Sequence, residues 1–531
     1  MNHIHAGVMQ LSQANHQVSP PEIHIPRQYN AAADLLMRHR NRSAKPAYIE
    51  AQSGKQLTYL QLNDQAHRFA QGILHMGLQA EDRVLLCMHD GLHWPVAFLG
   101  CILAGVVPVA VNTLLTSQDY LYMLQDSRAQ ALLVSAPLCP VFEPVISQLN
   151  HPLKIISDKT NTDLGYTNID DLIKQHEPLP GAAPTLADDV CFWLYSSGST
   201  GSPKGTVHLH SHLIHTAELY GRGVLGVRED DVVFSAAKLF FAYGLGNALS
   251  FPLTVGATTV LLGSRPTPAD VFHVLQSHQP TVFYGVPTLF AGLLAHAPRP
   301  AASQMNLRVC TSAGEALPAE IGHKWQAEYG VEILDGIGST EMLHIFLSNH
   351  PGRVRYGSTG HPVPGYRLRL VNDEGTECAD GELGELQISG PSAALMYWHN
   401  REKTKHTFAG EWTRSGDKYS RDADGYYTYG GRSDDMLKVG GIYVSPFEVE
   451  ASLMTHIAVL EAAVVGQADE EGLVKPKAYV VLKPNHAATE SELQAHVKGQ
   501  LAPYKYPRWI SFLSELPKTA TGKIQRFKLR A

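Results

Sequence analysis

The chain has 531 residues, of which 44% are apolar and 18% are charged, and its formal net charge is −7. This composition is that of a globular protein with a substantial core, and it excludes a disordered chain. The acidic balance argues against nucleic-acid binding, which usually needs a basic surface, so we expect no nucleic-acid partner. A chain of this length exceeds the usual size of one core, and we expect several lobes.

The cysteines are widely scattered and form no C-x-x-C pair, so the sequence indicates neither a zinc site nor a disulfide framework. They are Cys87, Cys101, Cys139, Cys191, Cys310 and Cys378. Residues 1–20 contain no apolar signal-peptide core. The longest apolar stretch, 96–111, is too short and too rich in glycine and proline for a membrane span. We therefore expect a cytoplasmic protein with no membrane partner.

Residues 1–30 show little helical or strand periodicity, and we expect an ordered or partly ordered arm of unassigned function. From about residue 55 to 345, helix-like and strand-like segments alternate, which predicts parallel sheets covered by helices. Helices are expected at 57–76, 94–104 and 120–126, and strands at 83–88, 106–111, 131–134, 258–262, 281–285 and 307–312. The last three strands end near Gly, Pro or Ser, as ligand-facing strand ends often do.

The last third of the chain changes character. Residues 353–430 predict a smaller β-rich subdomain, because the strands expected at 367–371 and 385–389 are separated by turn-forming Asp-Glu-Gly and Asp-Gly. The segment that follows predicts a small α+β domain with helices at 446–454 and 490–501, strands at 462–465 and 477–482, and a final loop. We place the boundary between a large domain, 1–433, and a small domain, 434–531.

The most informative segment is the loop at 195–206, which reads YSSGSTGSPKGT. Its glycines let the backbone approach an anion and point N–H groups at it, while the hydroxyls and Lys204 add donors and charge. The apolar run 190–194 predicts a strand before the loop, and a helix-compatible segment follows it, so a flexible linker is the weaker interpretation. A Walker A loop needs Gly-Lys-Ser/Thr, whereas here the lysine precedes the glycine.

This loop resembles the phosphate loop of adenylate-forming enzymes, the superfamily of acyl-CoA synthetases, peptide-synthetase adenylation domains and firefly luciferase. Further family motifs follow in the family's order: GIGSTE at 336–341, TRSGD at 413–417, GRSDD at 431–435 and PKTATGK at 517–523. Segments 240–247 and 335–346 look most like those of benzoate-CoA ligases. Five spaced motifs that cover nearly the whole chain after the arm are far more specific than any single motif.

The resemblance implies an α/β acyl-CoA synthetase that uses ATP, Mg²⁺ and coenzyme A, with a small mobile C-terminal domain. It assigns catalysis to Lys523, Glu341, Thr200 and Lys204, with Glu341 as the Mg²⁺ ligand and Asp434 as the hinge. The cofactor-binding residues that it implies are Ser196, Ser197, Gly198, Ser199, Thr200, Gly201, Lys204, Gly314, Glu315, Asp335, Gly336, Ile337, Gly338, Ser339, Thr340, Asp417, Arg432, Lys438, Gly440, Gly441, Tyr504 and Tyr506. Among them, the acceptor-only carboxylate of Asp417 suits the ribose hydroxyls.

The resemblance also implies a mostly apolar acyl pocket without a cationic group to meet a second carboxylate. Its members are Phe241, Ala242, Tyr243, Gly244, Ala313, Gly314, Gly336, Ile337, His344 and Ile345. A flat, uncharged ring fits such a slot, and we expect benzoate or a close relative as the acid. Taken alone, Ala313 and Ile345 are typical of ordinary core packing. With the resemblance, His344 and Ile345 are expected to close the far end.

Two other functions stay open. A stand-alone adenylation enzyme would load an aryl acid onto a carrier protein, and a non-catalytic nucleotide-binding protein would be expected to lack Lys523, Glu341 or Asp417, all of which are present.

His208, His212 and His215 could share one helical face, but no acidic or cysteine ligand lies nearby, so we favour a helix-start or surface role over metal binding. We expect a monomer or a homodimer.

Overall fold

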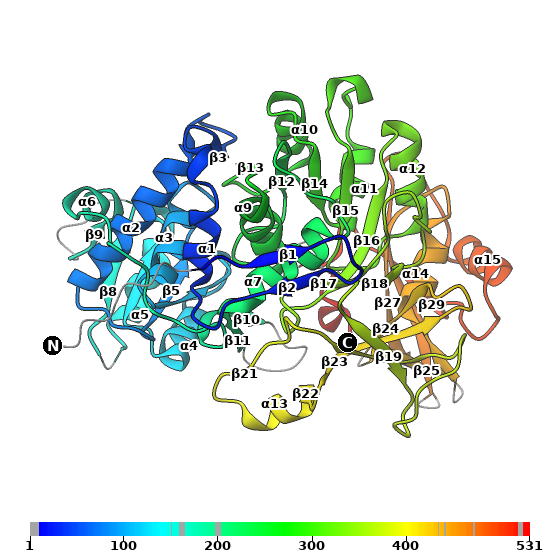
Figure 1. The fold of residues 1–531 in the computed structure, drawn as a ribbon. Helices are drawn as coiled ribbons and strands as arrows, with labels where there is room; N and C mark the ends of the chain where they lie inside the picture. The colour runs from blue at the N-terminus through cyan, green and yellow to red at the C-terminus, as the bar shows by residue number, and fades with distance from the viewer. Residues whose placement is uncertain are drawn as a thin grey trace.

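The computed structural model describes residues 10–149, 151–158, 165–196, 203–433, 435–439, 442–470, 473–518 and 524–530. In this part of the chain, two large helix-covered sheets form the N-terminal body, and a smaller sheet and a small C-terminal unit follow (Figure 1). The expected class, an α/β body with a small α+β unit at the C-terminus, is confirmed.

The first large sheet is parallel at its centre and antiparallel at one edge. Its spatial order is β21 (Met396–Tyr397), β11 (Lys204–Leu209), β10 (Val190–Ser196), β6 (Val107–Ala110), β5 (Arg83–Cys87), β7 (Ala131–Val134), β8 (Lys154–Ser157) and β9 (Thr167–Asn168). Strand β11, which we did not predict, therefore lies between the phosphate loop and the expected helix, which begins at His210. It forms a strand because it pairs along the length of β10, from Lys204 opposite Ser196 to Leu209 opposite Val190.

The second large sheet is also mixed, with antiparallel strands at its two edges and parallel strands between them. Its spatial order is β18 (His361–Pro362), β17 (Ile345–Ser348), β16 (Ile333–Gly338), β15 (Val309–Ser312), β14 (Val282–Gly285), β12 (Val232–Ser235), β13 (Thr258–Leu261), β3 (Pro46–Glu50) and β4 (Gln56–Thr58). In the register of the parallel pair β15–β16, Ser312 lies opposite Asp335. The predicted motifs that follow these two strands therefore meet at one edge of the sheet.

Helices cover the faces of both sheets (Figure 1). They are α1 (Ala31–Met37), α2 (Tyr59–His75), α3 (His93–Leu103), α4 (Ser117–Ser127), α5 (Cys139–Ile146), α6 (Ile169–Gln175), α7 (His210–Thr216), α8 (Ala242–Leu245), α9 (Phe251–Val255), α10 (Pro268–Ser277), α11 (Pro287–Ala295), α12 (Ala319–Tyr329) and α13 (Arg401–Thr407). Two π-helical segments, Ala217–Arg222 and Gly246–Ser250, interrupt this series.

Local sequence explains where α2 begins and why α3 is buried. Thr58 and Gln61 form a capping box, in which each side chain accepts the backbone N–H of the other residue. Nearly every residue of α3 is buried, which agrees with the interior helix expected in the longest apolar stretch. In the described part of the chain, every helix is too short or too polar to serve as a membrane span.

The third sheet confirms the expected β-rich subdomain. Its strands are β19 (Arg367–Val371), β20 (Gly384–Ser389), β22 (Phe408–Ala409), β23 (Trp412–Arg421) and β24 (Tyr427–Arg432), and all their pairings are antiparallel. The TRSGD motif lies on β23 and the start of the GRSDD motif on β24, with Asp417 opposite Arg432. The antiparallel pairing thus brings two distant motifs together.

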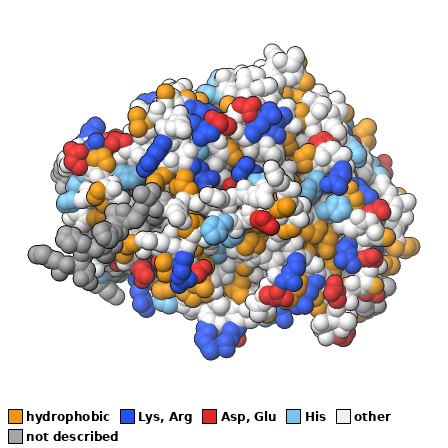
Figure 2. All heavy atoms as spheres, in the orientation of Figure 1, with side chains coloured by type: hydrophobic (Ala, Val, Ile, Leu, Met, Phe, Trp, Pro, Cys, Tyr) orange, Lys and Arg blue, Asp and Glu red, His pale blue; other side chains and the backbone are white. Residues whose placement is uncertain are grey.

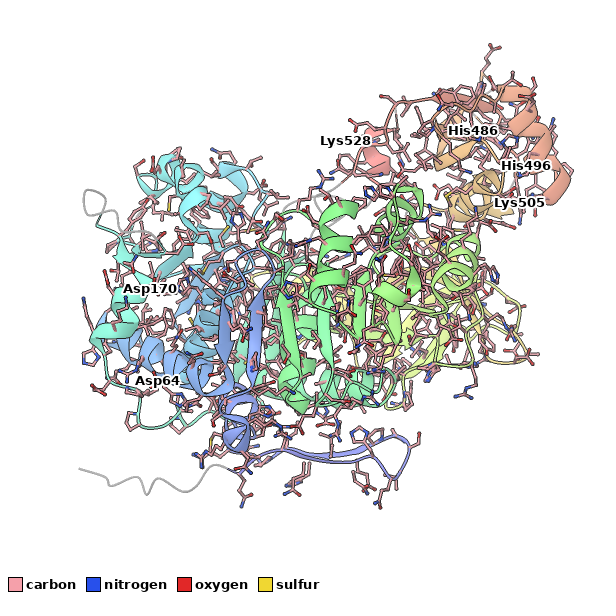
Figure 3. All side chains as sticks on the ribbon, turned by 90° about the horizontal axis from the view of Figure 1, so that it is seen from above. Asp64, Asp170, His486, His496, Lys505 and Lys528 are labelled. Atoms are coloured by element: carbon pink, nitrogen blue, oxygen red, sulfur yellow. The ribbon has the colours of Figure 1, made fainter. Side chains whose placement is uncertain are left out.

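The small C-terminal unit has its own core and stands out from the large body (Figure 3). Its elements are β25 (Leu437–Val439), β26 (Ile442–Val444), α14 (Pro446–Met454), β27 (Val459–Ala468), β28 (Val474–Leu482), α15 (Glu490–Gln500) and β29 (Trp509–Phe512), followed by a 3₁₀ turn at Arg526–Lys528. The prediction that this unit ends in a loop is wrong in one respect, because the final segment contains strand β29. This strand forms because it pairs parallel with β28, where Ile510 lies opposite Ala478 and is buried.

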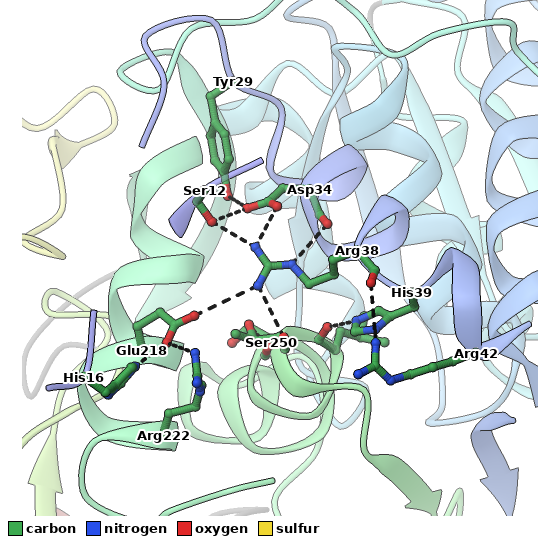
Figure 4. Close-up of polar contacts among 12 residues, drawn as sticks. Ser12, His16, Tyr29, Asp34, Arg38, His39, Arg42, Glu218, Arg222 and Ser250 are labelled. Carbon is green, nitrogen blue, oxygen red and sulfur yellow. Dashed lines mark hydrogen bonds and ion pairs between the residues drawn. The ribbon is translucent and has the colours of Figure 1, made fainter. Parts of the chain in front are cut away.

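The N-terminal arm contains a hairpin of β1 (Gln13–Asn15) and β2 (Glu22–His24) that crosses the surface of the large body (Figure 1). Strands this short show no readable period, which explains the lack of a signal in the sequence. The arm is anchored at Asp34, a fully buried residue of α1. One oxygen of Asp34 accepts hydrogen bonds from Ser12 Oγ at 2.5 Å and Tyr29 Oη at 2.7 Å, and the other from Arg38 Nη2 at 2.6 Å (Figure 4).

A second buried carboxylate, Glu218 in the first π-helical segment, continues this network (Figure 4). Its Oε2 lies 2.7 Å from His16 Nε2 and 2.8 Å from Arg222 Nη1, while its Oε1 lies 4.0 Å from Arg38 Nη1. We call the following residues the arm network: Ser12, His16, Tyr29, Asp34, Arg38, Glu218 and Arg222. It ties the arm to α1 and to the helices behind it.

The surface has mixed charge. On the face shown in Figure 2, acidic and basic side chains are interspersed, without one continuous basic patch. The cysteines named above are all buried and free, as the lack of a disulfide pattern predicts.

Candidate active site

The two ends of the predicted phosphate loop lie side by side. Strand β10 ends at Ser196, strand β11 begins at Lys204, and these two residues are partners in the antiparallel ladder. The loop residues predicted between them lie outside the described residues: Ser197, Gly198, Ser199, Thr200 and Gly201. The structure therefore shows where the loop starts and ends.

Glu341 lies beside the start of this loop. Its Oε1 accepts hydrogen bonds from Tyr397 Oη at 2.7 Å and from Ser196 Oγ at 3.4 Å. Its main-chain carbonyl accepts the Ala394 N–H at 2.7 Å, which holds the backbone at this position. Ser196 and Glu341 are separated by 145 positions, so the fold brings two of the predicted motifs into contact.

Tyr397 is a residue of the candidate site that sequence reasoning missed. Its hydroxyl contacts Glu341, and the ammonium group of Lys204 lies 4.5 Å from the centre of its ring, a cation–π contact. Burial and the Glu341 carboxylate raise the pKa of Tyr397, so the phenol stays protonated and donates. Burial lowers the pKa of Lys204, and Glu341 works in the opposite direction. Tyr397 gave no signal because an aromatic residue in an apolar strand is typical of core packing.

His208 contacts the backbone of the GIGSTE motif at Thr340. The surface or helix-start role expected for His208 is wrong. It is buried on β11, its ring stacks on Phe192 with centres 5.2 Å apart, and its Nε2 lies 2.8 Å from the Thr340 carbonyl oxygen. Because a carbonyl can only accept, Nε2 carries the proton. Burial lowers the pKa of His208 to about 4, so the ring is neutral at pH 7.

The other histidines of this segment lie on α7, where His210 and His212 are buried and His215 is partly buried. His212 Nδ1 lies 3.0 Å from His208 Nδ1. Among the described residues, no group of three or more His, Cys, Asp and Glu could hold a metal ion. This finding gives no support to a histidine metal site.

Asp335 and the glycines after it belong to the predicted adenine motif and lie on β16. Asp335 is 5% exposed, and its Oδ1 accepts the Leu317 N–H at 3.2 Å. Burial raises the pKa of Asp335 to about 8, so the carboxyl group is mostly protonated at pH 7 and can donate as well as accept. A side chain at Gly338 would place its Cβ 2.6 Å from the His344 carbonyl oxygen, so the close pairing of β16 with the 344–345 segment requires glycine there.

The remaining residues of this motif make local contacts. Gly336 and Ile337 lie on β16 opposite Ser348 and Leu347, and Ser339 Oγ accepts the Met342 N–H at 3.2 Å. Leu343, just beyond the motif, has a φ of +65°, a left-handed conformation that is uncommon for a leucine. The turn between β16 and β17 therefore holds the motif in a constrained backbone path.

Gly314 and Glu315 follow β15 at the same edge. Glu315 Oε1 accepts the backbone N–H of Ile524 at 3.1 Å, so the final segment of the small unit reaches this edge of the large body. Ile524 is the residue after the predicted catalytic Lys523, which lies outside the described residues. The predicted ribose residues are also paired, because Arg432 Nη1 donates to Asp417 Oδ1 at 3.2 Å and Asp417 is buried. Asp417 raises the pKa of Arg432.

The predicted acyl-pocket residues lie where two clusters of the core meet. Phe241 and Ala242 pack against one cluster, whereas Tyr243, Ile337, Ala313 and Ile345 belong to or pack against the other. Helix α8 carries Ala242, Tyr243 and Gly244, and the Tyr243 hydroxyl lies 2.5 Å from Thr311 Oγ1 on β15. The candidate pocket residues thus come from the β15–β17 side of the second large sheet and from helix α8.

His344 is held firmly in this region. It is 2% exposed, and its Nε2 lies 3.1 Å from the Tyr243 carbonyl oxygen and 3.2 Å from Asn247 Oδ1. Burial lowers its pKa to about 3, so the ring is neutral. A Cβ at Gly246 would lie 2.3 Å from His344 Cδ2, which shows how closely the second π-helical segment packs on the ring. The candidate pocket is therefore aromatic and carries no charge on His344.

The other predicted residues fall into two groups. Asp434, Gly440 and Gly441 lie outside the described residues, as does the side chain of Lys438. Tyr504 and Tyr506 lie in the small unit, where the Tyr506 ring has Arg508 at 3.7 Å and Lys498 at 4.0 Å from its centre. Lys505 between them pairs with Glu448 at 2.6 Å (Figure 3 marks Lys505). The contacts seen for these two tyrosines lie within the unit.

The family model described as "AMP-binding enzyme" matches residues 37–398, which contain Ser196, Lys204, Glu341 and Tyr397. This chain belongs to the family of AMP-binding enzymes. The model described as "AMP-binding enzyme C-terminal domain" matches residues 448–523 of the same family member.

Relatives of this AMP-binding enzyme cover it almost completely. It is 58% identical over 528 residues to the benzoate–CoA ligase of Thauera aromatica, a match that covers 98% of this chain and 99% of that protein. It is 49% identical over 516 residues to the 4-hydroxybenzoate–CoA/benzoate–CoA ligase of Rhodopseudomonas palustris, covering 95% and 94%. Among solved structures, a benzoate CoA ligase from Burkholderia xenovorans LB400 matches with a TM-score of 0.89 and 54% identity, covering 95% of this chain and 100% of that one.

Proposed function

We propose that this enzyme is an ATP-dependent, AMP-forming benzoate–CoA ligase. In the first half-reaction, the carboxylate of benzoate attacks the α-phosphorus of ATP, giving benzoyl-AMP and pyrophosphate. In the second, the thiol of coenzyme A attacks the acyl carbon, losing its proton and releasing AMP. The observation that carries the proposal is the 58% identity to a benzoate–CoA ligase over 98% of this chain.

The chain's own residues meet the needs of the first half-reaction. Benzoate is already ionised at neutral pH, so the site needs no general base. It must orient the two reactants and stabilise the negative charge that develops around the α-phosphorus. Lys204 and Ser196 stand at the two ends of the phosphate loop, and Thr200 with the loop glycines would hold the β- and γ-phosphates. Lys523 would reach the carboxylate and the α-phosphate, a role supported by Ile524 lying beside Glu315.

Glu341 suits a Mg²⁺ ion that is shared with the nucleotide. Mg²⁺ takes oxygen ligands and is usually bound through one or two carboxylates plus substrate phosphates and waters. Among the described residues, no group of three or more His, Cys, Asp and Glu could hold a metal ion, and Glu341 offers one carboxylate beside the phosphate loop, which fits this mode of binding. Mg²⁺, when bound, would neutralise charge on the phosphate oxygens.

The other motifs would bind the rest of the nucleotide. Residues 335–340 would contact adenine, with Ile337 packing on the base where many relatives carry an aromatic residue. The Asp417 carboxylate would accept hydrogen bonds from the ribose hydroxyls. Arg432, which already donates to Asp417, would hold that carboxylate in place. All the proposed site residues come from one chain, so a monomer and a homodimer are both compatible with the proposal.

The acyl site favours a flat, uncharged ring. Its candidate residues are aromatic or aliphatic apart from His344, whose pKa of about 3 keeps it neutral. An amino acid would bring an ammonium group next to these residues, and none of them offers an acidic partner, so its desolvation would be costly. Acetate would leave ring-sized apolar surface unfilled, while small ring substituents would change the activation free energy by about 1–3 kcal/mol each.

For the second half-reaction, we propose that the small domain, 434–531, rotates about Asp434 relative to the large domain, 1–433. Lys523 would then leave the site, and the segment 439–441 would line the path of the pantetheine arm, where two glycines leave room for a thin chain. Tyr504 and Tyr506 are proposed contacts to the coenzyme A nucleotide.

The test is an acid-dependent assay of pyrophosphate release, with and without coenzyme A. Benzoate should support pyrophosphate release and, with coenzyme A, thioester formation, with much higher kcat/KM than acetate, fatty acids or amino acids. A preference for aliphatic chains of eight or more carbons would contradict the aryl assignment. Thioester transfer to a carrier protein but not to coenzyme A would favour the alternative acceptor, and no acid-dependent release would favour a non-catalytic nucleotide-binding protein.

The half-reactions can be separated with Lys523→Ala. Benzoyl-AMP formation should fall by several powers of ten, because a principal positive charge at the α-phosphate is lost. Thioester formation from supplied benzoyl-AMP should largely survive. Equal losses in both half-reactions would contradict the proposed role of Lys523.

A further inference from the structure

Tyr397 is held in a fixed position by the backbone around it. It lies opposite Thr206 where β21 pairs with β11, the strand that follows the phosphate loop. On either side of it, Leu395 N donates to the Val207 carbonyl at 2.9 Å and Trp398 N donates to the Gly205 carbonyl at 2.8 Å. The placement of Tyr397 therefore depends on the same strand that positions Lys204.

The residue after it adds a second anchor. The Trp398 ring packs on Trp193 of β10 with centres 4.5 Å apart, and its Nε1 donates to the Asp126 carbonyl at 3.0 Å. Tyr397 itself is 3% exposed. A side chain with so little freedom can fix the groups that it contacts.

Two of the contacts of the Tyr397 side chain lead to two different proposed site residues. Its hydroxyl donates to Glu341 Oε1 at 2.7 Å, and its ring face lies under the Lys204 ammonium at 4.5 Å. The hydroxyl binds a carboxylate oxygen and the ring binds a cation. One side chain therefore sets both the orientation of the Glu341 carboxylate and the position of the Lys204 ammonium group.

We propose that Tyr397 is a positioning residue that presents Glu341 to the Mg²⁺–nucleotide complex and keeps Lys204 at the end of the phosphate loop. The inference rests on the proposed function, because it takes Glu341 as the metal ligand. The hydrogen bond to Oε1 leaves Oε2 of Glu341 for the metal complex. It also restricts rotation of the carboxylate in advance, so that less conformational freedom is lost when the metal complex binds. No atom of Tyr397 takes part in bond making or breaking.

Two substitutions separate the two contacts. Tyr397→Phe removes the hydroxyl and keeps the ring face for Lys204, whereas Tyr397→Leu removes both. Tyr29→Phe is the matched control, because Tyr29 is also buried and its hydroxyl also donates to a carboxylate, Asp34, at 2.7 Å. The control loses the same kind of hydrogen bond within the arm network.

The measurement is the Mg²⁺ concentration that gives half-maximal benzoate-dependent pyrophosphate release, at saturating ATP. Tyr397→Phe should raise it by about 10- to 100-fold, the size expected for a hydrogen bond to a charged group, while Tyr29→Phe should leave it within about twofold. Calorimetric binding of ATP with and without Mg²⁺, in the absence of acid, supplies a readout independent of turnover. Tyr397→Phe should weaken only the Mg²⁺-dependent part, and Tyr397→Leu should weaken ATP binding under both conditions.

A merely structural role for Tyr397 predicts a different result. In that case the two Phe variants would lower the melting temperature alike and leave the Mg²⁺ dependence unchanged, which would overturn the proposal. If the wild-type enzyme releases no pyrophosphate with any aryl acid, the proposed function fails. The calorimetric comparison of Tyr397→Phe with wild type still tests the positioning role in that event.

Discussion

The arm network and the group around Glu341 are both built on carboxylates that the fold brings to distant partners, but they are satisfied differently. Asp34 has donors on both oxygens, Ser12 and Tyr29 on one and Arg38 on the other. Among the described residues, the hydrogen bonds to the Glu341 carboxylate reach Oε1 alone. Both oxygens of the first carboxylate have protein donors, whereas the described residues supply donors to one oxygen of the second.

From this difference we predict that the first group stabilises the fold and that the second serves the proposed reaction. A buried carboxylate with full protein partners holds elements together, and removing it leaves an uncompensated charge. A carboxylate that is oriented on one side and open on the other is prepared for a ligand, and removing it should change function more than stability. Substitutions in the two regions should therefore give opposite patterns of stability and activity.

The largest expected effect is the loss of stability in Asp34→Ala. Arg38 is 15% exposed and would lose its closest counter-charge, so we expect a loss of about 3–5 kcal/mol in the free energy of unfolding. Asp64→Ala is the control, because Asp64 is 42% exposed and pairs with Arg68 at the same i,i+4 spacing (Figure 3). Denaturant unfolding monitored by circular dichroism compares them. Equal shifts in the two variants would contradict a structural role for the arm network.

Glu341→Gln should show the reverse pattern. We expect benzoate-dependent pyrophosphate release to fall by about 10²–10³-fold, because a charge that would orient the metal complex is lost. The unfolding midpoint should stay close to wild type, since Gln keeps an oxygen that can accept from Tyr397. Steady-state kinetics and the same unfolding assay test both parts. A stability loss as large as that of Asp34→Ala would show that Glu341 belongs with the structural carboxylates.

Asp335 should give the site a pH-dependent stability. Its folded pKa of about 8 lies above its ordinary unfolded value, so the folded state holds the extra proton and its stability falls as pH rises towards 8. The slope from this group is at most about 1.4 kcal/mol per pH unit. Buried histidines such as His208, whose pKa is lowered to about 4, act in the opposite direction, below about pH 6.5.

The buried histidines contribute alike to wild type and to a variant at Asp335, so the difference between the two proteins from pH 6.5 to 8 isolates Asp335. Asp335→Asn should flatten the loss of unfolding free energy with rising pH in this window, as measured by denaturant titrations at several pH values. Parallel curves for the variant and the wild type would contradict the burial-driven rise of the Asp335 pKa.

The smallest effect should come from His16→Ala at the edge of the arm network. The His16 side chain is 25% exposed, and Glu218 keeps Arg222 at 2.8 Å after the substitution. We expect a loss of at most about 1 kcal/mol in the free energy of unfolding and no change in ligation kinetics. A loss above about 2 kcal/mol would show that the hairpin contributes much more to the network than its exposure indicates.

Sequence patterns pointed to candidate site residues where the pattern is local. The glycine- and hydroxyl-rich loop and the GIGSTE motif led to Ser196, Lys204 and Glu341, and the structure brings these three together. Tyr397 could not be found in this way, because its two partners lie far away in sequence and its own strand is typical of core packing. The helix expected after the loop begins only at His210, because the residues before it pair with β10 as strand β11.

The sequence by itself determined the class of the protein, the alternation of helices and strands in its large body and the family to which its motifs belong. It could do so because glycine placement, apolar periodicity and motif spacing are properties of neighbouring residues. Only the tertiary structure decided that Tyr397 reaches Glu341, that Ile524 meets Glu315, and that burial raises the pKa of Asp335 to about 8. Those features depend on which side chains, far apart in the sequence, pack together and exclude water. A local sequence pattern does not encode that packing.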